Sequence, residues 1–501
     1  MDINANPLGL NTNPYELAAA LSGRMLIDGA LVPAISGKTF DAINPATGKV
    51  IGKVPYGEAA DVDKAVASAK KAQKDWAKVP ARQRGKAMMQ CVQAFFEHAE
   101  ELARLIALDT GNALRTQSRP EVATACETLS YFAGLGSEIK GETIPFSPDM
   151  LAMTVREPIG VVGAIVPWNA PMQLLMLKLG PALIAGNAVV VKAAEESSIC
   201  SVRVAQIMNS VLPKGVFNLI TGYGPECGGP LASHPDVKKI TFTGSVETGR
   251  IVYHAAAEKI IPVTLELGGK APMIVMADAD IDRTAKGALA AMRFSRQGQS
   301  CTAATRMFVH ESVIDEYVTK FKSEVDKLVI GEPLDEKSDV GTVISRQQFD
   351  RVHSYIDMGM KTPGAKVYAC SSLPKEPSLK EGFFIQPTFF TGLNNDSPVS
   401  REEIFGPVCC VIAFSDYDKV IAAANDTSFG LAASIWTRDL KTALDATRRI
   451  EAGFVQVNQN IIPIPPLSYG GIKTSGIGKE ASLEGMLEHF TYKKTIIINM
   501  T

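Results

Sequence analysis

A chain of 501 residues is too long for one simple core, so two or three domains are expected. Lysine and arginine number 51 against 53 aspartates and glutamates, and the resulting net charge of −2 favours neither nucleic acid nor an anionic membrane as a partner. Hydrophobic residues at 46% and charged residues at 21% are ordinary for a soluble globular protein.

The N-terminal segment has no basic start followed by an apolar core, and no apolar run is long enough to span a bilayer. The eight cysteines are scattered without CxxC pairs, which fits reduced thiols better than a disulfide framework or a zinc site. We therefore expect a cytoplasmic protein without a metal site, in which a cysteine is by default a small buried hydrophobe.

The predicted elements begin with strands and turns over 26–50, followed by helical patterns at 59–76 and 80–108. The continuous apolar run GVVGAIVP at 160–167 is typical of a strand buried on both faces. Strands and helices then alternate, which predicts a parallel, doubly wound sheet. The further strands are expected at 188–192, 216–220, 238–244 and 261–267, and the helices at 171–186, 201–212 and 247–259.

A second alternating series follows residue 269, with a strand at 271–276 and a helix at 280–294. Later strands are expected at 306–311, 408–414, 431–437 and 453–458. The tail, 489–500, alternates like an exposed strand that needs a partner.

Polar side chains with possible chemistry follow several of these strands. The amide of Asn169 could stabilise an oxyanion, although an asparagine there could simply make a turn. Glu195, three residues after Lys192, could accept bonds from a ribose diol or form an exposed ion pair. Glu266 ends an apolar strand, so burial should raise its pKa towards that of a general base, unless it only caps the next turn.

Two further motifs are also ambiguous alone. The stretch FTGSVETG offers Gly244 and Gly249 at a strand-to-helix turn, where a phosphate could approach, but glycines are common in such turns. Cys301 lies in the small, polar run FSRQGQSCTAATR, which suits either an accessible nucleophile or one more buried thiol.

The order of these motifs resembles the aldehyde dehydrogenase superfamily along nearly the whole chain. The motifs are PWN at 167–169, KxxE at 192–195, FTGS at 242–245, ELGGK at 266–270, GQxC at 298–301, EIFGPV at 403–408 and GGIKxSGxGKE at 470–480. The resemblance implies an α/β fold with two doubly wound parallel-sheet domains and a small β flap that makes a dimer or a tetramer. It places the cofactor domain at 1–135 and 155–266, the catalytic domain at 267–478, and the flap and tail at 136–154 and 479–501.

The resemblance also implies an NAD(P)-dependent enzyme that oxidises a small-molecule aldehyde to a carboxylic acid. In that mechanism Cys301 attacks the aldehyde, and the Asn169 amide and the Cys301 backbone N–H hold the oxyanion. Glu266 then activates the water that hydrolyses the resulting thioester. Lys178 and Glu480 match positions that relay the proton away from Glu266.

The cofactor contacts carry over by motif. They are Ile165, Val166, Pro167, Trp168, Lys192, Glu195, Gly244, Ser245, Leu267, Glu403 and Phe405. Glu195 would repel a 2′-phosphate, which favours NAD over NADP, although a rotated carboxylate can admit NADP.

Family positions that line the aldehyde tunnel are Ala170, Leu177, Ser295, Thr302, Ile461 and Ile462. These small and aliphatic walls predict a roomy, mostly apolar site without a charged anchor, and hence a bulky apolar or aromatic aldehyde, unless loop packing fills the space. Three departures from the family pattern stand out. Arg296 replaces a frequent Asn and Lys479 a frequent Arg, both expected to be tolerated, while Ser468-Tyr469 replaces Pro-Phe at the tunnel rim.

Two other functions are compatible with the scaffold. In a CoA-acylating semialdehyde dehydrogenase, CoA rather than water would accept the acyl group, but such relatives lack the carboxylate that Glu266 provides. A non-enzymatic binding or structural role is disfavoured because Cys301, Asn169, Glu266 and Glu403 are all present.

Overall fold

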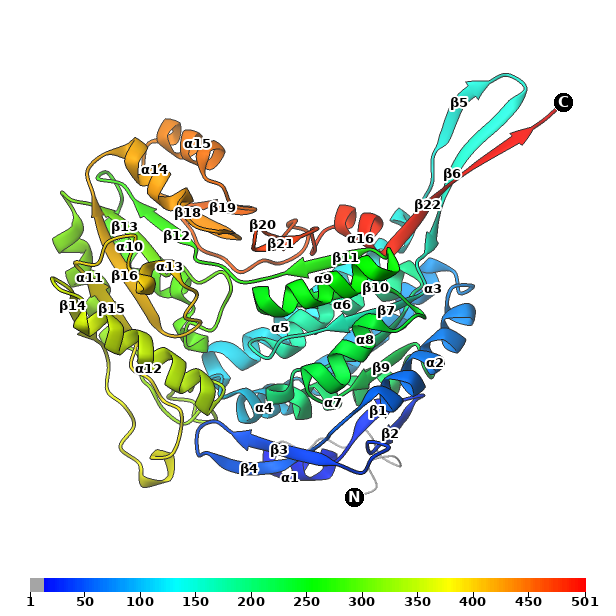
Figure 1. Cartoon of the computed structure of the whole chain (residues 1–501), viewed down its shortest axis with the longest axis horizontal. Coiled ribbons are helices and arrows are strands. Elements are labelled where there is room, and N and C mark those ends of the chain that lie inside the picture. The colour runs from blue at the N-terminus through cyan, green and yellow to red at the C-terminus, as the bar shows by residue number, and fades with distance from the viewer. Residues whose placement is uncertain (1–12) are drawn as a thin grey trace.

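The structure is a computed structural model that describes residues 13–501. Two lobes lie side by side, and a thin arm of three strands projects from one of them (Figure 1). Within these residues, no helix combines the length and the apolar character needed to cross a membrane.

The first lobe contains an eight-stranded sheet in the order β2-β1-β9-β8-β7-β10-β11-β21. Its five central strands are parallel, as predicted: β7 (Val161–Ile165), β8 (Ala188–Lys192), β9 (Phe217–Ile220), β10 (Val237–Thr243) and β11 (Val263–Glu266). The strands nearest the edges are antiparallel to their inner neighbours, namely β1 (Met25–Ile27), β2 (Ala30–Val32) and β21 (Gly476–Ile477). Strand β21 comes from far along the chain, beyond the second lobe.

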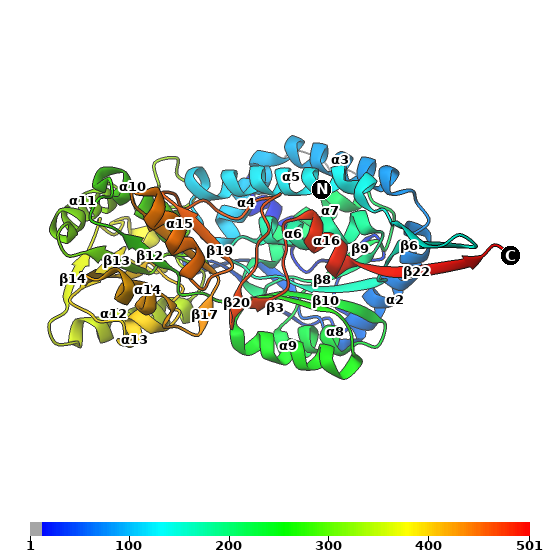
Figure 2. The ribbon, with the colours of Figure 1, turned by 90° about the horizontal axis from the view of Figure 1, so that it is seen from above.

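Helices cover both faces of this sheet, with α8 and α9 on one face and α3 and α5 on the other (Figure 2). The helices of the lobe are α1 (Pro14–Leu21), α2 (Ala59–Trp76), α3 (Ala81–Glu97), α4 (Ala99–Thr110), α5 (Arg119–Gly134), α6 (Pro171–Ala185), α7 (Ser198–Asn209), α8 (Gly229–Ser233) and α9 (Val246–Lys259). The large apolar core on the face covered by α3 and α5 is formed mainly by α3 to α7. This arrangement is the predicted doubly wound sheet.

The predicted single helix at 80–108 is wrong, because the structure divides it into α3 and α4. The break falls at His98, whose φ of −106° and ψ of 15° lie outside the helical range. The His98 N–H still closes α3 onto Ala94, while its carbonyl accepts the first bond of α4 from Leu102. Hydrophobic periodicity continued through this residue, so the pattern alone did not reveal the break.

The second lobe contains a seven-stranded sheet in the order β14-β15-β16-β13-β12-β18-β19. Its strands are β12 (Pro272–Val275), β13 (Arg306–His310), β14 (Lys366–Ala369), β15 (Thr388–Thr391), β16 (Val408–Phe414), β18 (Ala432–Trp436) and β19 (Phe454–Val457), and all but β14 are parallel. Its helices are α10 (Ile281–Met292), α11 (Ile314–Asp326), α12 (Arg346–Lys361), α13 (Pro398–Arg401), α14 (Tyr417–Asn425) and α15 (Leu440–Arg449). The second predicted α/β unit is therefore confirmed.

The arm consists of β5 (Thr143–Ser147), β6 (Met150–Pro158) and β22 (Thr491–Asn499), in the order β22-β6-β5. Strand β22 follows α16 (Leu483–Phe490) and pairs antiparallel with β6 along its full length, so the tail has the partner strand that its sequence pattern required. Two short pairs complete the fold, β3 (Thr39–Asn44) with β4 (Lys49–Pro55) and β17 (Phe429–Gly430) with β20 (Ile472–Lys473).

The order of the first sheet fixes where a ligand can bind. Strands β7, β8 and β9 follow one another outward, and the chain then returns to place β10 on the other side of β7. The carboxyl ends of β7 and β10 therefore form a switch point, where the following loops separate and leave a crevice.

Candidate active site

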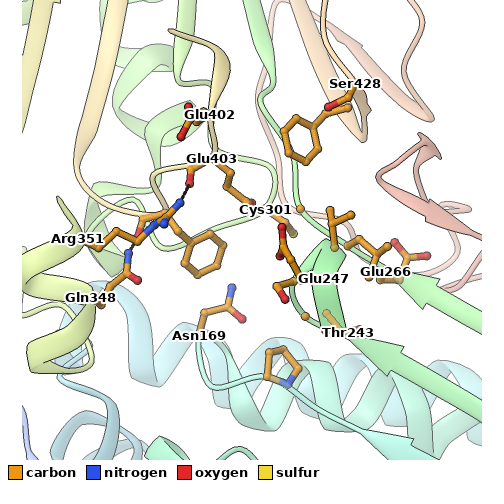
Figure 3. A pocket seen from close by; sticks show the side chains of 18 of the residues that line it. Asn169, Thr243, Glu247, Glu266, Cys301, Gln348, Arg351, Glu402, Glu403 and Ser428 are labelled. Atoms are coloured by element: carbon orange, nitrogen blue, oxygen red, sulfur yellow. Dashed lines mark hydrogen bonds between the residues drawn. The ribbon is translucent and has the colours of Figure 1, made fainter. Parts of the chain in front are cut away.

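A cleft of about 880 Å³ opens at this switch point, and both lobes contribute to its walls. The first lobe supplies the loops that follow β7, β10 and β11, and the second lobe supplies α12 and the segments 396–405 and 427–429. Figure 3 shows Cys301, Glu266, Asn169 and Glu403 around this space. The structure thus brings together four residues that are far apart in the sequence.

Cys301 lies in a loop that is fixed on several sides. The Gln299 side chain accepts a hydrogen bond from the Ile344 N–H at 3.0 Å, and Ala304 N donates to Ala291 O at 3.0 Å. Gly298 has a φ of +66°, and a Cβ atom there would come within 2.2 Å of the Gly406 carbonyl, so only glycine fits. The seven other cysteines are buried, and Cys301 alone is partly accessible.

Burial raises the pKa of Cys301 to about 11, although a hydrogen bond from Tyr469 and the charge of Arg296 act in the opposite direction. The Tyr469 hydroxyl lies 3.4 Å from the Cys301 sulfur. In this state the thiol form therefore dominates at neutral pH, and the thiolate needs further stabilisation.

Asn169 is buried in the loop after β7, beside the nucleophile's loop. Its Nδ2 donates a hydrogen bond to the Gln299 carbonyl at 3.0 Å, and its own carbonyl accepts from the Asn112 side chain at 3.3 Å. One of the two amide N–H groups is thereby used to orient the side chain. The other N–H remains to act as a donor in the cleft.

Glu266 ends β11 and is 4% exposed, and neither of its carboxylate oxygens has a hydrogen-bond partner within residues 13–501. Burial, followed by the nearby charge of Glu480, raises its pKa well above the ordinary value. Lys178 and Glu480 form a completely buried ion pair, and the Thr241 hydroxyl donates to the same Glu480 oxygen at 3.1 Å. A carboxyl, a lysine and a second carboxyl are thus gathered beneath the cleft.

Glu403 projects from the second lobe into the cleft. Its Oε1 accepts a hydrogen bond from the Gly269 N–H at 3.0 Å, and burial raises its pKa to about 7. A Cβ atom on Gly268 would lie 2.2 Å from Glu403 Oε2, which explains a glycine at this position. The Arg351 guanidinium donates to the Glu403 carbonyl at 2.6 Å (Figure 3).

Phe405 packs edge-on against Trp168, with ring centroids 5.3 Å apart, and therefore joins the two walls of the cleft. The Gln348 side chain donates to the Phe405 carbonyl at 2.8 Å. Gln348 and Arg351 were missed in the sequence because they are polar residues on an amphipathic helix, a pattern that usually marks only a solvated face.

The predicted cofactor residues fall into three groups. Those that line the cleft are Pro167, Trp168, Gly244, Ser245, Leu267, Glu403 and Phe405. Lys192 and Glu195 form an ion pair at the end of β8, next to β7 but outside the cleft's lining. Ile165 ends β7 and Val166 follows it, and neither residue lines the cleft.

A second pocket, of about 360 Å³, lies between α5, α10 and the segment that leads to Cys301. Of the predicted tunnel residues, Ser295 and Ile462 line it, whereas Ala170, Leu177 and Thr302 are buried and Ile461 is 39% exposed. Its lining also includes four charged residues, Glu121, Arg293, Arg296 and Asp339. This pocket therefore contains charged groups, which the prediction of a mostly apolar site without a charged anchor did not include.

The protein therefore has two α/β lobes, and a cysteine, an amide and a buried carboxyl line the cleft between them. This cleft lies at the switch point of the first sheet, where doubly wound proteins commonly bind nucleotides. Comparison with known proteins agrees, because the aldehyde dehydrogenase family model matches residues 32–496. Hydroxyisobutyraldehyde dehydrogenase of Mycolicibacterium austroafricanum is 39% identical over 477 residues, covering 95% of this chain and 94% of that protein. The chain belongs to the aldehyde dehydrogenase family.

Two solved structures are similar along almost their whole length. An aldehyde dehydrogenase from Bacillus cereus, solved as a mutant, is 35% identical with a TM-score of 0.93, covering 99% of this chain and 100% of that one. Betaine aldehyde dehydrogenase from Staphylococcus aureus, solved in complex with NAD+, is 34% identical with a TM-score of 0.93, covering 98% of this chain and 97% of that one. The fold expected from the sequence is confirmed.

Proposed function

We propose that this enzyme oxidises an aldehyde to the carboxylic acid with NAD, through a thioester on Cys301 that water hydrolyses. The observation that carries the proposal is that Cys301, Asn169 and Glu266 line one cleft. A nucleophile, an oxyanion donor and a base within one water-accessible space are the groups that a two-step acyl transfer requires.

In the first step the Cys301 sulfur attacks the aldehyde carbon and forms a thiohemiacetal. The unused N–H of Asn169 and the backbone N–H of Cys301 stabilise the negative charge that develops on the former aldehyde oxygen. Because burial raises the pKa of the thiol to about 11, attack requires that the proton leave as the carbon–sulfur bond forms. The nearby carboxyl of Glu266 is the cleft-lining base that can accept it.

In the second step Glu266 removes a proton from the water that attacks the thioester. Burial raises the pKa of Glu266 well above its ordinary value, so its carboxylate is a stronger base than an exposed one. The buried Lys178–Glu480 pair adjoins Glu266 and supports a route by which the proton leaves the site. The products are a carboxylate, one proton and the regenerated Cys301 thiol.

The residues present fit NAD. The N-terminus of α9 opens on the cleft at Gly244 and Ser245, where a helix end favours phosphate, and the Glu403 carboxylate faces the same space from the other lobe. Lys192 and Glu195 at the end of β8 suit a ribose, and the Glu195 charge disfavours an added 2′-phosphate. NAD, when bound, supplies the acceptor for the hydride whose loss converts the thiohemiacetal to a thioester.

The test is a panel of bulky and small aldehydes incubated with the enzyme and NAD, with and without CoA, followed by NADH absorbance and product analysis. We expect NADH and the free carboxylic acid in both cases. Formation of an acyl-CoA as the main product would show instead that CoA accepts the acyl group. A pocket of about 360 Å³ lined by the small Ser295 supports a bulky aldehyde as the substrate.

We also propose the domain division expected from the sequence. It is supported by the two separate sheets and their separate apolar cores, although β21, at 476–477, joins the first sheet rather than the second. The arm exposes apolar side chains, among them Ile144, Phe146, Ile497 and Ile498, which supports its role in a dimer or tetramer. Light scattering at micromolar concentration tests this role, and a monomer would contradict it. The unpaired cysteines support a cytoplasmic location.

A further inference from the structure

The second pocket shares its wall with the nucleophile's segment. Ser295 and Arg296 line this pocket, and Cys301, five residues after Arg296, lines the main cleft. The Arg296 charge also lowers the pKa of Cys301, so the guanidinium lies close enough to influence the sulfur. A molecule held in this pocket is therefore well placed to present a reactive end to Cys301.

The Arg296 side chain is 7% exposed, yet its guanidinium takes part in no hydrogen bond or ion pair with any residue from 13 to 501, and its Nε is fully enclosed without a partner. A guanidinium has five N–H donors and keeps its charge in proteins. Burying such a group without acceptors is unfavourable, so its position requires an explanation.

The other buried arginines show what a structural role looks like in this protein. Arg203 bonds to Glu101 and Gln206 at 2.6 Å each, and Arg306 donates to three backbone carbonyls at 2.8 to 3.1 Å. Arg84 donates to two carbonyls, and Arg293 uses both terminal nitrogens to hold the carbonyls of Asn460 and Ile461. Arg293 also leaves its Nε without a partner, but among these arginines of the described chain only Arg296 has a guanidinium that makes no hydrogen bond at all.

Neither acidic residue of the pocket forms a hydrogen bond or an ion pair with Arg296 in the described chain, although the charges of Glu121 and Arg296 attract each other. Glu121 accepts hydrogen bonds at the N-terminus of α6, from Met172 N at 2.9 Å and Gln173 N at 3.5 Å, and no ion pair joins it to Arg296 in the described chain. Asp339 is paired with Arg115. Asp339 and one oxygen of Glu121 therefore have partners of their own, and the donors of Arg296 remain available to a ligand.

We infer that Arg296 binds a carboxylate carried by the substrate, so that the preferred substrates are semialdehydes with an aldehyde at one end and a carboxylate at the other. The inference rests on the proposed function. A guanidinium fork matches the planar carboxylate with two parallel hydrogen bonds. A doubly charged phosphate fits less well, because Glu121 stands nearby and would repel it more strongly.

The test compares aldehydes that differ only in a carboxylate, 4-carboxybenzaldehyde with benzaldehyde and succinic semialdehyde with butanal. For each we measure kcat/KM in the wild-type enzyme, in Arg296→Gln and in Arg296→Lys. We expect the wild type to prefer the carboxylated member of each pair. Arg296→Gln should reduce kcat/KM for that member by about 10- to 100-fold, and for the neutral member by less than about threefold. Arg296→Lys keeps the charge but lacks the planar pair of donors. Its kcat/KM for the carboxylated member should therefore lie between the values for the wild type and for Arg296→Gln.

Arg283→Gln is the matched control, because it removes one positive charge from α10 at an exposed residue outside the pocket lining. It should leave the ratio between the two aldehydes unchanged. A binding measurement free of turnover uses thermal shifts with terephthalate and with benzoate. Terephthalate should stabilise the wild type more than benzoate does, and Arg296→Gln should lose this difference.

The possible failures are distinguishable. If neutral aldehydes are oxidised but the wild type shows no preference for their carboxylated partners, the inference is overturned and the proposed function stands. If Arg296→Gln slows both members of a pair equally, Arg296 is a structural residue and the inference is again overturned. If no aldehyde is oxidised while terephthalate still stabilises the wild type through Arg296, the proposed function fails and the anion site remains.

Discussion

The Tyr469 hydroxyl lies 3.4 Å from the Cys301 sulfur, and the tyrosine is only 4% exposed. Its ring packs with Leu177 in a small apolar cluster and meets Phe454 edge-on, with ring centroids 6.1 Å apart. Its backbone exchanges two hydrogen bonds with Glu480, at 2.6 and 3.0 Å. The hydroxyl is therefore held firmly against the nucleophile, where it can donate to the sulfur when the proton leaves.

Changing Tyr469 to phenylalanine keeps the ring and removes that donor. Because the hydrogen bond lowers the pKa of Cys301, its loss should raise that pKa and slow alkylation of the thiol by iodoacetamide about tenfold at a fixed pH. The measurement is the rate of inactivation across a pH series. Tyr317→Phe is the control, since this buried tyrosine also contacts a sulfur, that of Met307, but outside the cleft. An unchanged Tyr469→Phe profile would remove the hydroxyl from any role in activating the thiol.

Because Cys301 is partly accessible and Cys409 is buried, replacing each with alanine should affect activity very differently. Cys301→Ala should abolish aldehyde oxidation while NAD binding, measured by calorimetry, persists. Cys409→Ala should retain most activity and lose on the order of 1 kcal/mol of stability, because Cys409 is buried in β16. Equal loss of activity in two folded variants would contradict the assignment of the nucleophile.

Glu266→Gln should separate the two half-reactions. Attack and oxidation should still occur once, whereas hydrolysis of the thioester should slow by roughly 10²- to 10⁴-fold because water lacks its base. Stopped-flow measurement of NADH should show a burst of about one NADH per active site followed by a very slow steady state. If Glu266 also takes the Cys301 proton, the burst will be slower as well. Normal steady-state turnover without a burst would show that this carboxylate is not the base.

Asn169→Ala provides the complementary experiment. The oxyanion forms before the hydride leaves, so loss of the amide should slow the burst itself by roughly 10²- to 10³-fold. The same stopped-flow assay measures this rate. A normal burst followed by a slowed steady state would show instead that the Asn169 amide acts in hydrolysis of the thioester.

The pH dependence of kcat should reflect the ionisation of Glu266. The charge of Glu480 helps to raise the pKa of Glu266, so Glu480→Gln should lower that pKa and move the rising limb of kcat to lower pH. The sign follows because the base must be ionised to act, and a lower pKa ionises it at lower pH. Glu488→Gln, a change on α16 outside the cleft, serves as the control. A limb that stays in place or moves to higher pH would contradict the electrostatic link between the two carboxyls.

Cofactor choice depends on the carboxylate at the end of β8. Glu195→Gln removes the charge that would repel a 2′-phosphate, so the ratio of kcat/KM for NADP to that for NAD should rise by about tenfold. Parallel assays with the two cofactors measure it. A ratio that does not change would place the discrimination elsewhere.

Sequence patterns predicted most of the fold because strands buried on both faces are continuous apolar runs. Strand β8 (188–192) and strand β16 (408–414) have the predicted limits. Cleft residues at or just after the ends of such strands, including Asn169, Gly244 and Glu266, were also identified, since the ends of parallel strands converge at one edge.

Contacts that depend on how distant segments meet were not predictable. Nothing local shows that Tyr469 reaches Cys301, 168 residues earlier in the chain. Arg296 was interpreted as a tolerated departure, because a sequence shows the residue but not whether its donors find acceptors. The break at His98 was missed for a related reason, since a single non-helical residue does not interrupt the periodicity of the helices around it.

Strand β21 has a consequence for the order in which the protein is made. It pairs with β11 at Leu265 and Glu266, and Glu480 follows it by only a few residues. The surroundings of the proposed base are therefore completed only by residues that are synthesised after the whole second lobe. A nascent chain in which the Cys301 loop has been synthesised still lacks Tyr469 and Glu480. An aldehyde that reached Cys301 at this stage would therefore meet an incomplete active site. Activity in this protein should begin only after residues 469–480 have been synthesised and have folded against the first lobe.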